Sequence, residues 1–195
     1  MNRYAELYGS WRWQVPARYN IAQACCGRWA GDRSRFALYW EDESGETAKY
    51  TFWDIPRAAN RLSNALAGLG VKRGDRVALV LPQRPEMAIA YMAIFQMGAI
   101  ALPLSHLFGP EALEYRMAFA GASVVFVEPT TIVNLWAVRD KLPELRHVIG
   151  VGGARETGVH AYEALIQKAK SEFKKTDTTA NDPALIIYTS GTTGP

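Results

Sequence analysis

The residues best suited to chemistry lie at the carboxyl end of the chain. The apolar run Ala184-Leu-Ile-Ile-Tyr188 is followed directly by Thr189-Ser-Gly-Thr-Thr-Gly194-Pro195. The first part, β-branched in its middle, predicts a buried strand. In the second part, Gly191 and Gly194 let the backbone turn sharply and approach a ligand closely. Hydroxyl donors supplement the backbone amides of this loop, at Thr189, Ser190, Thr192 and Thr193.

A strand that ends in such a loop indicates an anion site, because N–H groups and hydroxyls can converge on phosphate oxygens. The loop is not a Walker A loop, which has four residues between its glycines and then a Lys-Ser/Thr pair. Ser190 has no assignable general base, so we interpret it as a phosphate donor rather than a nucleophile. Taken by composition alone, the run would also fit an ordinary turn.

The elements that must position this loop alternate between strands and helices. Glycines and prolines divide them: Pro85 and Pro110 predict helix starts, and Gly98 and Gly121 predict helix ends. This alternation predicts an α/β fold with a mostly parallel sheet flanked by helices, in which ligands bind beyond the carboxyl ends of the strands. The expected strands are 76–81, 100–102, 123–127, 146–151 and 184–188, and the expected helices are 86–97, 110–120, 131–141 and 161–170. Residues 171–181 read as a polar linker.

The amino-terminal part predicts smaller units. Residues 2–19 read as an irregular segment, in which Trp11 and Trp13 serve as packing anchors. Asn20 is a cap for a helix over 21–29. A β-hairpin is expected from strands 36–40 and 47–50. Thr51 and Asp54 match a capping box that opens an amphipathic helix ending at Gly68–Gly70. We therefore expect an N-terminal extension with one helix over 1–35, and an α/β subdomain over 36–195.

Composition is globular, with 49% hydrophobic and 21% charged residues among 195. The net charge of +3 is small and its lysines and arginines are scattered, which argues against nucleic acid as a partner. The neighbouring Cys25 and Cys26 cannot easily form a disulfide, and no signal-peptide core is visible, so a reduced cytoplasmic location is expected. The apolar stretch 87–104 is near the lower length limit of a membrane span, but Gly98 and Pro103 divide it, so we interpret it as core.

Tyr188-Thr-Ser-Gly-Thr-Thr-Gly-Pro195, after a strand opened by Asp182-Pro183, resembles the signature loop of the adenylate-forming (AMP-binding) superfamily. Further segments in the same order resemble the N-terminus of an acyl-CoA synthetase, of the branch related to acetyl-CoA synthetase and medium-chain enzymes. They include Gly70-Val-Lys-Arg-Gly-Asp-Arg-Val77, Met97-Gly-Ala-Ile100 and Leu107-Phe-Gly-Pro-Glu-Ala-Leu113.

The resemblance implies an acid–thiol ligase that uses ATP, Mg²⁺ and coenzyme A. A carboxylate would attack ATP to give an acyl-adenylate and pyrophosphate, and coenzyme A would then displace AMP. The implied binders of the departing phosphates are Thr189, Ser190, Gly191, Thr192, Thr193 and Gly194. Tyr188 and Asp182 match the family pattern too, but as strand packing and a turn cap. No catalytic or metal-binding residue is assigned.

Departures from the family pattern leave alternatives open. The family motif continues with Pro-Lys-Gly, so the chain is expected to stop within the phosphate loop and to be inactive alone. Glu128-Pro-Thr-Thr131 stands where acetyl-CoA synthetases carry an Arg/Gly-rich coenzyme A contact, which disfavours acetate. The alternatives are an aryl-acid or peptide-synthetase adenylating enzyme, and a non-catalytic α/β binding module. His106 is a candidate contact for coenzyme A or nucleotide, whereas the spacing of His106, His147 and His160 does not match a metal site.

Overall fold

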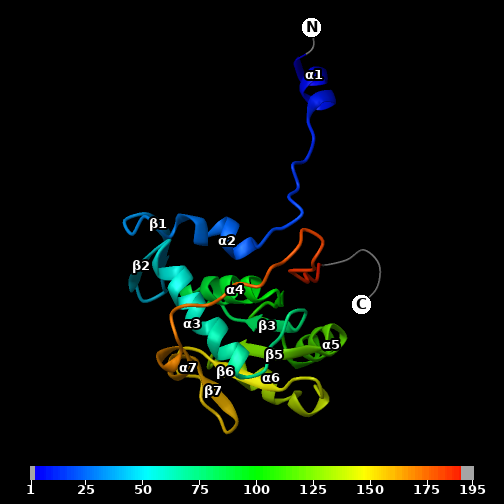
Figure 1. Cartoon of the computed structure of the whole chain (residues 1–195). Coiled ribbons are helices and arrows are strands. Elements are labelled where there is room, and N and C mark those ends of the chain that lie inside the picture. The colour runs from blue at the N-terminus through cyan, green and yellow to red at the C-terminus, as the bar shows by residue number, and fades with distance from the viewer. Residues whose placement is uncertain (1–2, 190–195) are drawn as a thin grey trace.

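The computed structural model describes residues 3–189, and its centre is a parallel β-sheet. Five strands lie in the order β4-β3-β5-β6-β7 (Figure 1). Their bounds are Arg76–Val80 (β3), Ile100–Pro103 (β4), Ala122–Val127 (β5), His147–Gly150 (β6) and Val159–Ala161 (β7). The expected α/β class and parallel sheet are confirmed. The short edge strand β7 was not expected, since three residues carry too little pattern to be recognised.

Helices cover both faces of the sheet, because successive strand residues point in opposite directions. In β3, Val77 and Leu79 pack in one core cluster with helices α3, α4 and α7, whereas Ala78 and Val80 pack in a second with α5 and α6. These four strand residues are fully buried. The helices are α3 (Asp54–Gly68), α4 (Pro85–Met97), α5 (Pro110–Ala120), α6 (Ile132–Trp136) and α7 (Tyr162–Lys168).

Helix boundaries follow the prolines and glycines closely. Pro85 and Pro110 occupy the first turns of α4 and α5. Gly98 (φ 68°) and Gly121 (φ 61°) end them in the left-handed conformation, which glycine adopts without a steric penalty. The apolar stretch 87–104 therefore forms α4 and β4, both in the core. Between residues 3 and 189, no helix combines the length and apolar character that crossing a bilayer would require.

The expected helix over 131–141 is interrupted. It divides into α6 and the 3₁₀ turn η2 (Arg139–Lys141), and the expected helix over 21–29 divides into α2 (Ile21–Cys25) and η1 (Gly27–Trp29). Asn20 caps α2 as expected, since its Oδ1 accepts from the Gln23 amide at 3.2 Å.

The segment before Tyr19 contradicts the sequence prediction in part. Its first half is a helix, α1 (Arg3–Ser10), with no buried residue, and it extends away from the body (Figure 1). Trp11 and Trp13 contact one another at 4.5 Å between ring centroids, but they are 54% and 79% exposed. They are therefore not anchors in a core.

The hairpin and the capping box are confirmed. Strands β1 (Phe36–Glu41) and β2 (Thr47–Thr51) pair antiparallel. The Asp54 amide donates to Thr51 Oγ1 at 3.2 Å, and the Thr51 amide donates to Asp54 Oδ2 at 2.9 Å. This reciprocal pair satisfies two amides at the start of α3.

The expected linker over 171–181 is a strap fixed to the body. Asn64 Nδ2 donates to the carbonyls of Lys170 and Glu172 at 2.9 and 2.8 Å. The Thr176 amide donates to the Gln96 carbonyl, at the end of α4, at 2.8 Å. Thr178 is 7% exposed, and its hydroxyl donates to the Tyr19 carbonyl at 2.7 Å. These bonds fix the path of the strap, and therefore the position at which residues 182–189 reach the sheet.

Candidate functional site

The segment 184–189 passes beside β4, the outer strand of the five-stranded sheet, and joins it by one isolated bridge. The Ala101 amide donates to the Ala184 carbonyl and the Ile186 amide donates to the Ala101 carbonyl, both at 2.9 Å, in a parallel bridge. Because the bridge is parallel, the chain reaches Thr189 at the carboxyl edge of the sheet, that is, the edge formed by the carboxyl ends of β3, β4 and β5. This is the edge at which parallel α/β sheets bind ligands.

The prediction that 184–188 forms a buried strand is wrong on both counts, because the segment makes an isolated bridge rather than a strand and is partly exposed. Leu185 and Ile187 are 42% and 61% exposed, while Ile186 and Tyr188 pack on the core. Only one bridge joins the segment to β4. The exposure has a physical reason. The segment lies outside β4, so among the described residues one of its faces packs on the core and the other faces solvent.

Tyr188 fixes the carboxyl end of this segment. Its hydroxyl donates to the Arg116 carbonyl in α5 at 3.0 Å. The Arg116 guanidinium carbon in turn lies 4.4 Å from the Phe108 ring centroid and 5.5 Å from that of Tyr188. Burial is the main cause that raises the pKa of the Tyr188 hydroxyl, so the group remains a neutral donor. The packing role expected for Tyr188 matches these contacts.

Asp182 fixes the other end. Its Oδ2 accepts from the Thr179 amide at 2.8 Å, which is the expected turn cap. Both carboxylate oxygens also lie 2.6 Å from Arg73 Nη2. The pKa of Asp182 is lowered by the Thr179 hydrogen bond first and by Arg73 second. The segment that leads to the loop is thus held at both of its ends.

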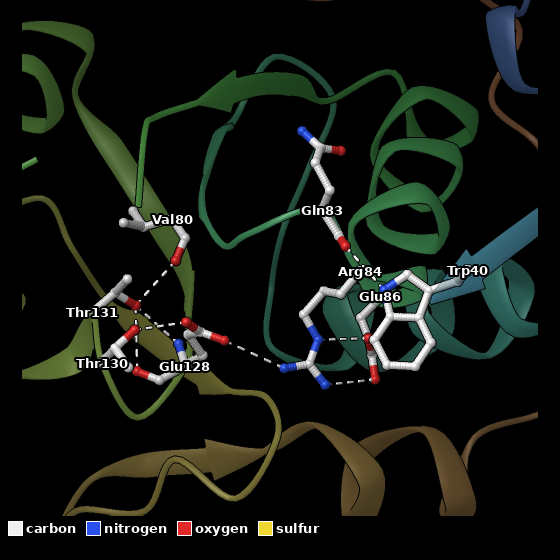
Figure 2. A network of polar contacts seen from close by, with 8 residues as sticks. All are labelled: Trp40, Val80, Gln83, Arg84, Glu86, Glu128, Thr130 and Thr131. Carbon is white, nitrogen blue, oxygen red and sulfur yellow. Dashed lines mark hydrogen bonds and ion pairs between the residues drawn. The ribbon is translucent and has the colours of Figure 1, made fainter. Parts of the chain in front are cut away.

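The same edge carries an ionic network centred on Arg84, which follows β3 (Figure 2). Arg84 forms a fork with Glu86, with Nε–Oε2 at 2.7 Å and Nη2–Oε1 at 3.2 Å, and its Nη1 lies 3.5 Å from Glu128 Oε2. The three side chains are only 15–20% exposed. Burial acts to lower the pKa of Arg84, but the bonds and charges of Glu86 and Glu128 outweigh it, and the pKa is raised.

The network also holds the loop after β5. Thr130 Oγ1 donates to Glu128 Oε1 at 2.6 Å, and Thr131 Oγ1 donates to the Val80 carbonyl at the end of β3 at 3.0 Å. Figure 2 shows Arg84 reaching between Glu86 and Glu128 from the loop after β3. Two loops at the carboxyl edge are therefore held together by charge.

Of the predicted phosphate binders, the structure describes one. Thr189 is described and exposed. The others, Ser190, Gly191, Thr192, Thr193 and Gly194, lie outside the described residues. His106 is exposed in the turn after β4, at the same edge as Thr189.

Sequence reasoning missed two pairings that the fold creates. Arg84 and Glu128 are 44 positions apart, and no local pattern joins them. His147 Nδ1 and His160 Nε2 lie 3.3 Å apart on neighbouring strands β6 and β7. Recognising β7 would have brought these histidines together, because a parallel partner places them side by side. Among residues 3–189, no group of three or more His, Cys, Asp or Glu side chains is arranged to hold a metal ion.

The family model for AMP-binding enzymes matches residues 27–195, which is most of the chain. The chain belongs to the AMP-binding enzyme family. This AMP-binding chain is 33% identical to an uncharacterised acyl-CoA ligase of Bacillus subtilis over 182 residues, covering 92% of this chain and 33% of the relative. It is also 33% identical to the acetyl-coenzyme A synthetase of Bacillus subtilis, covering 100% of this chain and 36% of that enzyme.

Solved structures agree with the fold. The anthranilate CoA ligase AuaEII, solved with anthranoyl-AMP, superposes with a TM-score of 0.85 at 26% identity, over 92% of this chain and 34% of that one. The chain spans about a third of the length of the relatives it matches. The family resemblance inferred from the loop is therefore confirmed.

Proposed function

We propose that this chain is the N-terminal part of an ATP-dependent acid–CoA ligase and contributes its phosphate-binding loop. In the proposed reaction a carboxylate attacks the α-phosphorus of ATP, which yields an acyl-adenylate and pyrophosphate, and the thiol of coenzyme A then displaces AMP. The observation that carries the proposal is the course of 184–189. It runs parallel to β4, is held by Tyr188 and Asp182, and ends with Thr189 at the ligand-binding edge of the sheet.

The loop's proposed role is to hold the β- and γ-phosphates as they depart. Charge builds on these oxygens in the transition state, so donors already aimed at them lower the barrier without covalent chemistry. The two bonds to β4 and the Tyr188 hydroxyl order the strand side of the loop beforehand, which reduces the entropy cost of binding. The proposed donors are the backbone amides and hydroxyls of Thr189, Ser190, Gly191, Thr192, Thr193 and Gly194.

Mg²⁺ and coenzyme A are proposed as the accompanying groups. Mg²⁺ prefers carboxylate, water and phosphate oxygens. The carboxylates described at the edge, Glu86 and Glu128, do not suit it, because both are already paired with Arg84. The metal would therefore arrive on the triphosphate. Glu128 also places a negative charge where acetyl-CoA synthetases are expected to carry a basic contact for coenzyme A. This difference from acetyl-CoA synthetases is in keeping with a substrate other than acetate.

An aryl-acid CoA ligase is the second candidate. It is favoured by the close superposition on the anthranilate CoA ligase. We further propose the division into an extension over 1–35 and part of the AMP-binding domain over 36–195. A reducing, cytoplasmic location fits the two free cysteines.

The test is ATP–pyrophosphate exchange by the complete gene product that contains these residues, with a panel of aliphatic and aromatic acids. Losing one donor to the transition-state charge lowers rates by about 10²–10³ in comparable sites, so Ser190→Ala and Thr192→Ala should each lower kcat by that order. Thr157→Ala, at an exposed site in the loop after β6, is the matched control. Exchange at the wild-type rate in both loop variants would refute the proposal. We predict no exchange above a blank for residues 1–195 alone.

A further inference from the structure

The side chain of Arg116 contacts two aromatic rings that come from different segments of the carboxyl edge. Its guanidinium carbon lies 4.4 Å from the Phe108 ring centroid and 5.5 Å from that of Tyr188. Both separations are within the range of about 6 Å over which a cation is attracted to a ring. Phe108 lies in the turn after β4, and Tyr188 directly precedes Thr189. Arg116 therefore connects this turn with the segment that leads to the proposed phosphate loop.

The two rings, rather than polar partners, account for the environment of this guanidinium. Arg116 Nη1 donates to the Ala112 carbonyl of its own helix at 3.1 Å, and Nε is buried without a hydrogen-bond partner among the described residues. No carboxylate of residues 3–189 forms an ion pair with it. A buried donor without a partner costs free energy, which an apolar side chain would avoid. Only a cation, however, adds electrostatic attraction to both rings.

One of the two rings is fixed more firmly than the other. The Phe108 carbonyl accepts from Asn134 Nδ2 in α6 at 3.2 Å, which ties the turn after β4 to a second helix. The segment 184–189 is joined to the sheet by one isolated bridge. Both rings pack on the same core cluster. Arg116 can therefore pass the position of the fixed turn on to the less firmly held Tyr188.

We propose that Arg116 is a positioning residue for the phosphate loop, an inference that rests on the proposed function of that loop. The Tyr188 hydroxyl bonds to the main-chain carbonyl of residue 116 and holds the segment against α5. The guanidinium holds the Tyr188 ring beside the turn after β4, and so sets the direction in which the chain enters Thr189. A displacement of about 1 Å in a reacting geometry can cost about 10²-fold in rate.

The first test is ATP–pyrophosphate exchange by the complete gene product that carries Arg116→Met. This change removes the guanidinium and leaves the main-chain bond to Tyr188. We expect kcat to fall by about 10–100-fold. KM for ATP should change little, because donors aimed at the developing charge act on the transition state and not on the bound substrate.

Arg61→Met is the matched control for stability. Arg61 is also half-buried, and its Nη1 donates to the carbonyls of Ile166 and Ala169 at 3.3 and 2.8 Å. Ile166 packs on the core cluster of the opposite face of the sheet. This variant should lose stability but keep the wild-type kcat, with circular dichroism giving the folded fraction of each protein.

Two further variants separate the flat guanidinium from its charge. Arg116→Lys keeps the charge but lacks the planar group that stacks on rings, so we expect it to lose activity as Arg116→Met does. If the charge itself acted on the phosphates, lysine would restore the rate. Phe108→Leu combined with Arg116→Met should have about the same kcat as Arg116→Met alone, because both changes remove one shared contact.

Hydrogen exchange tests the same contact without catalysis. The Ile186 amide donates to the Ala101 carbonyl at 2.9 Å and reports whether the segment stays on β4. Mass spectrometry of a peptide that covers 184–189, from the complete gene product, should show exchange about fivefold faster in Arg116→Met, as expected for the loss of one such cation–ring attraction. Arg61→Met should leave this exchange unchanged.

The proposal is overturned by a wild-type kcat in Arg116→Met or Arg116→Lys, by an equal fall in Arg61→Met, or by additive effects in the double variant. Unchanged hydrogen exchange of 184–189 in Arg116→Met overturns it as well. A wild-type protein that shows no pyrophosphate exchange with any acid refutes the proposed function instead. Hydrogen exchange then decides alone whether Arg116 positions the segment.

Discussion

Tyr188 and Arg116 are joined by a hydrogen bond of 3.0 Å from a phenol to a backbone carbonyl, across 72 positions of sequence. The bond connects helix α5 with the segment that leads to the proposed phosphate loop. Because it engages a main-chain group, it fixes where the segment ends without depending on the identity of the residue at 116.

Replacing Tyr188 by Phe should remove this bond and keep the ring packing. A hydrogen bond of this kind contributes about 1 kcal/mol, so we expect the free energy of unfolding to fall by about that amount. Urea titration with a fluorescence readout measures it. Tyr115→Phe, at a half-exposed site on α5, is the control and should change little. A Tyr188→Phe protein as stable as wild type would show that the bond is not formed in solution.

Asp182 should make stability depend on pH in the acidic range. Its folded-state pKa is lowered from the ordinary value of 3.8, so its contribution is fully present above that value and is lost as pH falls through the lower, folded-state pKa. We expect the stability difference between wild type and Asp182→Asn to be constant near neutrality and to shrink below about pH 4. Unfolding curves at several pH values measure this difference. A difference that grows on acidification would contradict the assignment.

Arg84 should be more costly to lose than an exposed arginine. Exposed ion pairs contribute at most about 1 kcal/mol, and breaking a fully buried pair costs about 3–5 kcal/mol. For this network, in which side chains are 15–20% exposed, we expect Arg84→Met to lower the free energy of unfolding by about 2 kcal/mol.

The loss would arise from unpaired carboxylates, so removing their charge should reverse part of it. Arg84→Met combined with Glu86→Gln and Glu128→Gln should be more stable than Arg84→Met alone. Thermal unfolding of the two proteins compares them directly. If the combined variant is no more stable, the unpaired charges of Glu86 and Glu128 are not what destabilises Arg84→Met.

The two cysteines should react at very different rates. Cys25 is exposed, whereas burial, with Cys25 as a lesser cause, raises the pKa of Cys26 to about 11. Only the thiolate is nucleophilic. Near pH 8, iodoacetamide should therefore label Cys25 first, and Cys26 should react rapidly only in denaturant, as peptide mass spectrometry would show. Equal labelling of the native protein would contradict the burial of Cys26.

The parts of the fold that could be predicted are those with local causes. Pro85, Gly98, Pro110 and Gly121 determine helix boundaries through backbone geometry alone, and all four function as expected. The Thr51–Asp54 box is equally local. Strand β7 was missed because its three residues become a strand only by pairing with β6.

The candidate site was predictable to a smaller degree. The loop sequence and its strand indicated which edge of the sheet to inspect, and 184–189 does end at that edge. The exposure of Leu185 and Ile187 was not foreseen, because an apolar run looks the same at a sheet's centre and at its edge. The partners of Arg84 come from two different loops, and only the tertiary structure reveals them.

The strap also sets an order of events during synthesis. The Tyr19 carbonyl accepts from the hydroxyl of Thr178, 159 positions later, and the Tyr19 amide donates to the Thr178 carbonyl. A nascent chain emerges from the ribosome amino end first, at about 5–20 residues per second. The backbone groups of residues 17–19 that bond to the strap must therefore stay solvated for roughly ten seconds or more, until the strap emerges. The helices and strands in between can assemble meanwhile, so the amino-terminal segment is sealed onto the body as one of the last steps of folding.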